Sequence, residues 1–500
     1  MKIETFLEHH GITSNPFVDE DAQTDLVFKR HCIDGTHHPA WSKVFGDPTE
    51  PATAVVFGEK GSGKTALRLQ IVRHLRQFNA EHPKERLHVI EYDDFNPFLD
   101  RFRQNVPQRF RRPDRLLSQW KLWDHMDAIL SIATTELVDA ILRDEAASPE
   151  KLDVSRLQQE RFDRLQARDV LLLAACYDQS ISEPFAVRWY RLRRKLHFHT
   201  WRSKRVFAIG ALVTLVVVGV LVTQYASQKN WDWLASPWPY VFATAAWLPW
   251  LWRCAKRFWL ARLICRQLRV VDHDTGRLRR VLMQFTSDEL LGQPLPTSQR
   301  TDDRYEMLDK YLNILKTLGY SGAFVIIDRV DEPHLVNGSA EQMRALIWPI
   351  LDNKLLKHSG VGFKLLLPIE LAHFVDREDR DFYQRARLDK QNMVRSLEWT
   401  GEALFDVANA RLAACAVDGR TPRMTDLFDE SLTQDRLVDA LRSLRVPRHL
   451  FKFMYQVLMA HCNAYTDENP LWKITPSTFE STLALYHRQQ DAFDRGMGAG

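Results

Sequence analysis

The chain has 500 residues, a length that allows two or three domains. Lysine and arginine number 68 against 64 for aspartate and glutamate, so the formal net charge is +4 and the overall charge indicates no particular partner. The six cysteines are scattered without a CxxC pair, which argues against a disulfide framework or a zinc site and is typical of reduced thiols in a cytosolic protein.

A glycine-rich segment in the first part of the chain carries the strongest chemical signal. It reads Gly58-Glu59-Lys60-Gly61-Ser62-Gly63-Lys64-Thr65. An apolar run at 54–57 precedes it and a helical pattern at 66–72 follows, which is the strand–loop–helix setting of a phosphate-binding loop. Backbone N–H groups of such a loop surround phosphates, Lys64 reaches the outer phosphates, and the Thr65 hydroxyl holds Mg²⁺. A glycine-rich turn without a ligand is the alternative, and the agreement of every fixed position disfavours it.

A basic segment follows between residues 101 and 115. Its arginines are interleaved with phenylalanines: Arg101, Phe102, Arg103, Arg109, Phe110, Arg111, Arg112 and Arg115. This composition suits nucleic acid or anionic lipid. A solvated surface is the alternative and the more common outcome for a run of charges, so nucleic acid is considered as a partner but is not favoured.

Two apolar stretches in the middle of the chain predict a membrane hairpin. The first, at 206–225, is uncharged and, as a helix, about as long as a bilayer core is thick. The second, at 234–252, is rich in tryptophan, which suits membrane interfaces, and contains Pro237, Pro239 and Pro249, which membrane helices tolerate. An interfacial segment that does not cross the membrane is the alternative for the second stretch.

The charges that flank these stretches indicate the topology. Basic residues are dense at 191–205 and 253–262, whereas the connecting residues 226–233 hold only Lys229 and Asp232. By the positive-inside rule, both ends of the chain are expected in the cytoplasm, with a short loop outside. A single span would separate the phosphate loop from the acidic motif described next, so the hairpin and a shared nucleotide site support each other.

A second acidic signal lies far downstream of the phosphate loop. The apolar run at 323–327 ends in Asp328, and Asp331 and Glu332 follow shortly after. A buried strand that delivers an acid at its carboxyl end is the second half of a nucleotide site, in which Asp328 holds Mg²⁺ mostly through water. Either Asp331 or Glu332 would polarise the attacking water. A strand that ends in a polar turn is the alternative, and the presence of the phosphate loop favours the functional interpretation.

These features together resemble KAP-type P-loop NTPases, which belong to the STAND and AAA-like wing of the P-loop class. The resemblance covers most of the chain and rests on the phosphate loop, the long gap with two apolar stretches, and the sequence Asp328-Arg329-Val330-Asp331-Glu332. The Asn15-Pro16-Phe17 opening is also similar to bacterial AAA-like ATPases related to origin-recognition proteins. Arg329 departs from the glutamate that AAA enzymes usually place after the Mg²⁺ aspartate, so slow hydrolysis is expected.

The resemblance implies a further site residue in the C-terminal part of the chain. In those families a Pro-Arg pair in the helical lid contacts the γ-phosphate, and Pro447-Arg448 matches this pair. Arg448 is therefore the expected sensor. An ordinary helix start with proline in its first turn is the alternative interpretation.

The alternation of strand and helix patterns predicts an α/β fold with a mostly parallel sheet. With the resemblance, this implies a three-layer P-loop NTPase core, an inserted helical and transmembrane hairpin region, and a C-terminal helical lid. The predicted boundaries are 1–112 for the N-terminal segment and first half of the core, 113–299 for the insertion, 300–400 for the second half of the core, 401–490 for the lid, and 491–500 for a disordered tail.

The resemblance also implies the function. It predicts ATP and Mg²⁺ as cofactors and a membrane-anchored, cytoplasmic-facing ATPase, multi-pass in the bacterial inner membrane. Such a protein is expected to act as a nucleotide-dependent switch or small oligomeric motor in antiviral (phage) defence. Besides the lipid bilayer, the implied partners are further copies of the chain and an operon-encoded protein. The alternatives are a membrane-tethered nucleic-acid-dependent ATPase and a nucleotide-binding scaffold that hydrolyses nothing.

Overall fold

The chain forms two compact units. Unit 1 comprises Met1–Val89, Phe324–Ile347 and Leu351–Gly500, and unit 2 comprises Ile90–Ala323 and Trp348–Ile350. The computed structural model describes residues 1–143, 152–159, 161–228, 236–351, 354–386, 388 and 393–494. Residues 495–500 of the predicted disordered tail and residues 229–233 of the predicted outer loop lie outside the described residues. Residues 491–494 of the predicted tail are not disordered but form the end of helix α22 (Pro476–Asp494).

A five-stranded parallel sheet forms the centre of the fold, in the order β2-β3-β4-β1-β5. The strands are β1 Ala54–Gly58, β2 Arg86–Tyr92, β3 Tyr320–Ile327, β4 Val361–Pro368 and β5 Met393–Val394. Val56 of β1 lies opposite Leu366 of β4 on one side and Val394 of β5 on the other. The fold is therefore mixed α/β with a parallel sheet, as predicted. Because the strands are parallel, the residues that follow β1, β3 and β4 leave the sheet at the same edge.

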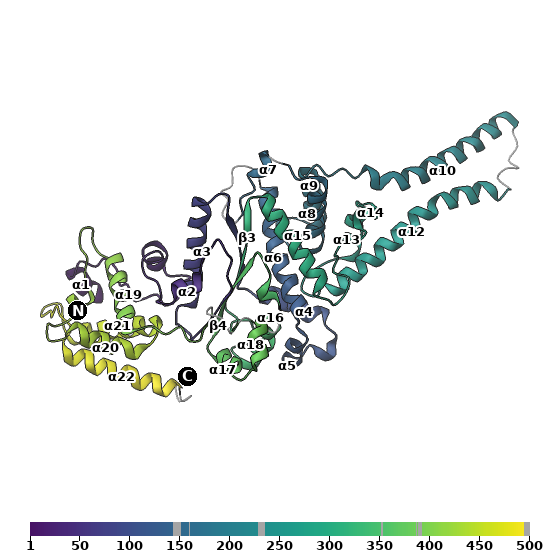
Figure 1. Cartoon of the computed structure of the whole chain (residues 1–500). Coiled ribbons are helices and arrows are strands. Elements are labelled where there is room, and N and C mark those ends of the chain that lie inside the picture. Colours follow the sequence, from purple (N-terminus) through teal and green to yellow (C-terminus); the bar gives the residue numbers. More distant parts are fainter. Residues whose placement is uncertain are drawn as a thin grey trace. The chain divides into compact units, whose positions relative to one another are not determined.

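Unit 1 holds two hydrophobic cores. In the first, helix α3 (Lys64–Glu81) covers one face of the sheet, where Leu67 and Ile71 pack with Val56 and Leu366. The second joins the N-terminal helix to the C-terminal helices (Figure 1). The helices of unit 1 besides α3 are α1 Ile3–His9, α2 Trp41–Phe45, α16 Ala340–Leu351, α17 Glu370–Val375, α18 Arg380–Ala386, α19 Gly401–Ala414, α20 Gln434–Leu444, α21 Pro447–Ala464 and α22 Pro476–Asp494.

A lysine is buried in the central strand β4. Lys364 is 1 % exposed, and its Nζ donates to the carbonyl oxygens of Val44 at 2.8 Å and Phe45 at 3.0 Å. The ammonium also lies 4.8 Å from the centre of the Phe324 ring. Burial lowers the pKa of Lys364 from its usual 10.5 to about 7, because the charged form loses hydration.

This lysine makes the stability of the fold depend on pH. The unfolded chain keeps its proton on Lys364 up to about pH 10.5, whereas the folded chain releases it near pH 7. The unfolded state therefore binds more protons between these values, so stability rises with pH in that window by on the order of a few kcal/mol. We expect Lys364→Met to flatten this rise in thermal unfolding of the full chain at pH 7 and pH 9. Lys316→Met, at an exposed lysine, is the control; a parallel pH response in both variants would contradict the assignment.

Unit 2 is mainly helical and is held by buried ion pairs along helix α6. The Asp127 carboxylate and the Arg304 guanidinium are both fully buried and lie 3.1 Å apart, and the Tyr177 hydroxyl donates to Asp127 at 3.0 Å. Burial raises the pKa of Asp127, and Arg304 opposes this. The main helices of unit 2 are α4 Asn96–Asn105, α5 Pro113–Leu116, α6 Leu122–Leu142, α8 Arg164–Tyr177, α9 Phe185–Lys195, α10 Trp201–Gln228, α12 Trp238–Gln267, α13 Thr275–Leu282, α14 Ser287–Leu290 and α15 Asp302–Thr317.

Helices α10 and α12 run side by side and extend away from the other helices of unit 2 (Figure 1). Trp247 of α12 donates from Nε1 to the Thr214 hydroxyl of α10 at 2.9 Å and packs over Gly210, where an added Cβ would lie 3.3 Å from the indole. Among the described helices, only α10 is long and apolar enough to cross a membrane. The apolar part of α12 ends at Arg253 and is rich in tryptophan and proline, whose hydropathy is low, so the second span stays a prediction.

Candidate functional site

Residues 58–65, the predicted phosphate-binding loop and called the phosphate loop below, connect β1 to α3 at the carboxyl edge of the sheet. Gly61 and Gly63 have φ values of 91° and 92°, a left-handed conformation that glycine adopts without strain. A Cβ at Gly61 would lie 2.6 Å from the Cβ of Arg448, so a larger residue there would displace the arginine. The sequence therefore needs glycine at Gly61 for both its backbone conformation and its contact.

Lys64 starts helix α3 and lies over its own loop. Its Nζ donates to the carbonyl oxygens of Gly58 at 2.7 Å and Glu59 at 3.0 Å. Burial lowers the pKa of Lys64, and among the acidic groups that oppose this, Asp331 contributes most, followed by Asp328. The ammonium group therefore lies against the loop backbone, and the two acids that follow β3 favour its charged form.

Asp328 follows the last residue of β3 and meets the start of α3. Its side chain is buried, and the Thr65 hydroxyl donates to its Oδ2 at 3.3 Å. Arg68, one helical turn after Thr65, places its Nε 3.4 Å from the same oxygen, and the N–H of Arg329 donates to Oδ1 at 2.9 Å. Burial raises the pKa of the Asp328 carboxyl, and the Arg68 guanidinium opposes this. The hydroxyl and the carboxylate predicted to share a metal ion thus lie together.

The turn after Asp328 presents the two candidate bases. Arg329 has a φ of 59°, which is unusual for a residue with a side chain, and its Nε lies 3.6 Å from Glu332 Oε1. Partial burial raises the pKa of Glu332, and Arg329 opposes this. The side chain of Glu332 is 57 % exposed, so it keeps access to water while it pairs with Arg329.

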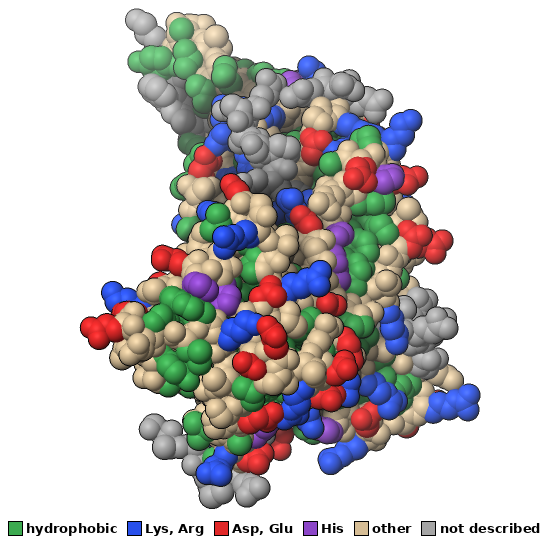
Figure 2. Space-filling model, turned by 90° about the vertical axis from the view of Figure 1, so that its left-hand side faces the viewer, with side chains coloured by type: hydrophobic (Ala, Val, Ile, Leu, Met, Phe, Trp, Pro, Cys, Tyr) green, Lys and Arg blue, Asp and Glu red, His purple; other side chains and the backbone are tan. Residues whose placement is uncertain are grey.

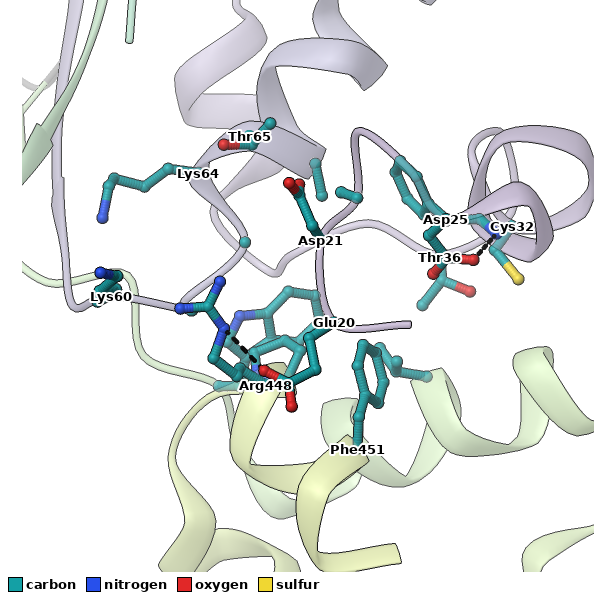
Figure 3. A pocket seen from close by; sticks show the side chains of 18 of the residues that line it. Glu20, Asp21, Asp25, Cys32, Thr36, Lys60, Lys64, Thr65, Arg448 and Phe451 are labelled. Carbon is teal, nitrogen blue, oxygen red and sulfur yellow. Dashed lines mark hydrogen bonds and ion pairs between the residues drawn. The ribbon is translucent and has the colours of Figure 1, made fainter. Parts of the chain in front are cut away.

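Two residues from the C-terminal part of unit 1 contact the phosphate loop. Arg448, in the first turn of α21, donates its N–H to the Gly61 carbonyl at 3.4 Å. Its side chain reaches Glu20, with Nε 3.6 Å from Oε2, as the dashed line in Figure 3 shows. Trp399 donates from Nε1 to the Ser62 carbonyl at 2.8 Å. Two donors from the C-terminal part of unit 1 therefore bind carbonyl oxygens of the loop.

One pocket of unit 1 collects the predicted site residues. It is bordered by Lys60, Gly61, Gly63, Lys64, Thr65, Asp328, Arg329, Asp331, Glu332 and Arg448. Gly58, Glu59 and Ser62 complete the loop behind them. Lys60, Lys64 and Arg448 gather at one end of the pocket, whereas Asp25, Cys32 and Phe451 lie at the other (Figure 3). The structure therefore brings the loop, the acid and the sensor candidate to one place.

Sequence reasoning missed the residues at the far end of this pocket. Arg411 of α19 pairs with the buried Asp25, donates from Nε to the Pro16 carbonyl at 2.7 Å, and lies 4.3 Å from the centre of the Phe451 ring. The Asn15-Pro16-Phe17 motif was a signal that the N-terminal segment matters, but no local pattern pointed to Arg411.

The arginine-rich segment at 101–115 belongs to unit 2 and does not border this pocket. Among its arginines, Arg103, Arg109, Arg112 and Arg115 are exposed. The Arg109 guanidinium lies 4.7 Å from the centre of the Phe110 ring. This arrangement is compatible with a solvated surface and with an anion-binding surface.

Comparison of the sequence with protein-family models found no match, and searches of curated proteins and of solved structures found none either. The functional argument therefore rests on the geometry of the site.

Proposed function

We propose that the chain binds Mg²⁺–ATP and acts as a membrane-anchored ATPase, a nucleotide-dependent switch or small oligomeric motor. The observation that carries this proposal is the hydrogen bond from the Thr65 hydroxyl to Asp328 Oδ2, at 3.3 Å, in the pocket that Lys64 also borders. Thr65 ends a loop with the sequence of a phosphate-binding loop. A glycine-rich turn without a ligand would not need a buried aspartate at the hydroxyl of its threonine.

The residues present fit a magnesium nucleotide. Mg²⁺ prefers oxygen ligands, and the Thr65 hydroxyl would supply one directly while the Asp328 carboxylate would hold the ion mostly through water. Lys64 and the loop N–H groups would bind the β- and γ-phosphates, and Arg448 would add positive charge at the γ-phosphate. A carboxylate at Asp331 or Glu332 would orient the attacking water and take its proton, while the bond between the γ-phosphorus and the bridging oxygen breaks to give ADP and phosphate.

Calorimetry on the full chain in detergent tests the proposal. We expect ATP to bind when Mg²⁺ is present and to bind much more weakly when the ion is chelated. Competition between GTP and ATP measures whether the chain distinguishes guanine from adenine, which the far end of the pocket would contact. Absence of nucleotide binding under all these conditions would overturn the proposal.

The catalytic base is tested by removing each candidate carboxylate. We expect Asp331→Asn or Glu332→Gln to lower ATP turnover roughly a hundredfold, the usual contribution of a general base, while Mg²⁺–ATP binding stays intact. Turnover is measured as phosphate release. Glu341→Gln, at an exposed acid in α16, is the matched control. Normal turnover in both single variants and in the double variant would show that neither residue is the base.

One observation favours a second candidate function, a nucleotide-binding scaffold that does not hydrolyse ATP. Arg329 directly follows Asp328, and its guanidinium lies 3.6 Å from Glu332 Oε1, so this carboxylate is engaged in an ion pair within its own turn. A wild-type chain that binds Mg²⁺–ATP but releases no phosphate would establish the scaffold and exclude the ATPase.

We further propose that α10 and α12 insert as a hairpin into the bacterial inner membrane, with both termini in the cytoplasm. The length and apolar composition of α10, its contact with α12 and the basic residues on either side of the pair support this location. Phage defence, with a further copy of the chain or an operon-encoded protein as partner, is the biological setting that the resemblance implies.

A further inference from the structure

The second half of α12 has two different faces. Arg257, Ala261 and Ile264 are buried, and α12 packs against α13. Their spacing of four and three residues is that of one helix face. This half of α12 therefore has an inner face that is already used inside unit 2.

The opposite face of the same segment is apolar, aromatic and exposed. Trp252 is 75 % exposed, Trp259 63 % and Leu263 44 %, and their spacing of seven and four residues aligns them along one stripe. Lys256 borders the stripe on one side, and Arg262 and Arg266 border it on the other. All three cations are exposed. We call these six residues the α12 outer stripe.

The region around the hairpin is almost free of acidic residues. Residues 184–271 contain fifteen lysines and arginines and a single acid, Asp232. The face of the molecule shown in Figure 2, by contrast, mixes acidic and basic side chains. A surface of one sign with exposed tryptophans differs from the mixed surface of an ordinary soluble helix.

Some of these cations are occupied within the protein, but those of the α12 outer stripe are not. Arg253 donates to the carbonyl oxygens of Met283 at 3.1 Å and Phe285 at 2.7 Å, and Arg257 donates to the Thr286 carbonyl at 3.2 Å. Within the described residues, no ion pair or side-chain hydrogen bond of Lys256, Arg262 or Arg266 is seen. These three charges are available to an anion outside the chain.

We propose that the α12 outer stripe lies on the anionic phospholipid headgroups of the leaflet into which α10 inserts. This inference rests on the proposed membrane location and not on nucleotide binding. Tryptophan favours the interface between hydrocarbon and water, and lysine and arginine beside it attract lipid phosphates. Trp252 stands where the apolar part of α12 ends, so the stripe continues directly from the membrane segment.

The geometry requires α12 to be tilted. Headgroups extend roughly 5–8 Å beyond each side of the hydrocarbon core. Trp259 lies about 10 Å further along the helix than Trp252 at the rise of an α-helix. An upright helix would leave Trp259 and Leu263 in water, whereas a helix tilted toward its outer face brings them to the lipid. Because the inner face of α12 is covered by α13, only the outer face is free to approach the lipid, so the helix is expected to tilt toward that side.

Spin-labelled lipids test the inference on the full chain reconstituted in bilayers. We expect wild-type protein to retain phosphatidylglycerol roughly threefold more than phosphatidylcholine, and this preference to fall in high salt. The variant Lys256→Gln/Arg262→Gln/Arg266→Gln should lose most of the preference. The control Arg76→Gln/Lys84→Gln/Lys316→Gln removes three exposed cations elsewhere and should keep it.

Two results would overturn the inference. One is a wild-type chain that resists extraction by alkaline carbonate but shows no lipid preference, or a preference that the stripe variant leaves unchanged. The other is binding of the α12 outer stripe to a second copy of the chain. In that case Trp259→Ala/Leu263→Ala would lower the yield of cross-linked oligomers without changing the lipid preference. Complete extraction by carbonate would instead refute the membrane location itself, and ATP binding would be unaffected in every case.

Discussion

Lys64→Ala is expected to weaken Mg²⁺–ATP binding by roughly a hundredfold or more. Charge-assisted hydrogen bonds are each worth about 1.5–3 kcal/mol, and Lys64 would make more than one to the outer phosphates. In the structure, Nζ donates to the carbonyl oxygens of Gly58 and Glu59 at 2.7 Å and 3.0 Å, so it is already aimed along the inside of the loop. Isothermal calorimetry on the full chain in detergent measures the loss.

The matched control is Lys84→Ala. Lys84 is exposed and does not border the pocket, so its removal takes away the same charge and should change affinity only slightly. Thermal unfolding of both variants without nucleotide separates a binding defect from a folding defect. Full-strength binding by a folded Lys64→Ala variant would refute the site assignment.

The strand–loop–helix arrangement around residues 58–65 could be predicted because its sequence pattern is local. The fixed glycines, Lys64 and Thr65 lie within eight residues between a strand and a helix, and each of these elements has its own pattern. Asp328 could be predicted as well, because an acid at the end of a buried parallel strand lies at the same edge as the loop after β1. The pattern around residues 58–65, the apolar run that ends at Asp328 and the topology of a parallel sheet were therefore sufficient to predict that the loop and this acid lie together.

The other half depends on contacts between distant segments. Trp399 binds the Ser62 carbonyl, and Glu20 pairs with Arg448. Periodicity describes which face of a helix is buried, but it does not say which distant segment covers that face. The same limit applies to unit 2, where no local pattern indicates that Asp127 pairs with Arg304.

The ends of two elements also differ from the sequence prediction. The residue pattern at 394–399 favours a last strand, but within the described part of the chain β5 comprises Met393–Val394. The N–H of Trp399 donates to the Arg445 carbonyl, and its indole donates to the phosphate loop, so these groups are drawn away from the sheet. In the hairpin region, the second apolar stretch is predicted at 234–252, but the helix that contains it, α12, begins at Trp238, after Pro237.

The second large effect is expected from charges placed in α10. Val213→Asp/Val217→Asp should prevent insertion of α10, since an aspartate at the centre of a membrane helix costs roughly 3 kcal/mol. Only a small share of the apolar part of α10 is buried against the rest of the chain, 6 %, so the protein itself offers little to stabilise these charges or to replace lipid. The variant should leave the carbonate-resistant membrane fraction, while its phosphate loop, in unit 1, still binds Mg²⁺–ATP.

The control for this variant places the same two charges on exposed apolar residues of unit 1. Val417 is 48 % exposed and Leu485 51 %, so Val417→Asp/Leu485→Asp adds equal charge without a lipid-facing position and should leave the chain in the membrane fraction. Protection against phage is then compared in cells that carry each variant. If membrane attachment is part of the switch, cells with the α10 variant lose protection although the variant still binds nucleotide. Cells with the control variant keep protection, and the control still binds nucleotide. Protection by an α10 variant shown to be off the membrane would mean that the hairpin is dispensable, and the proposed coupling between nucleotide and membrane would be wrong.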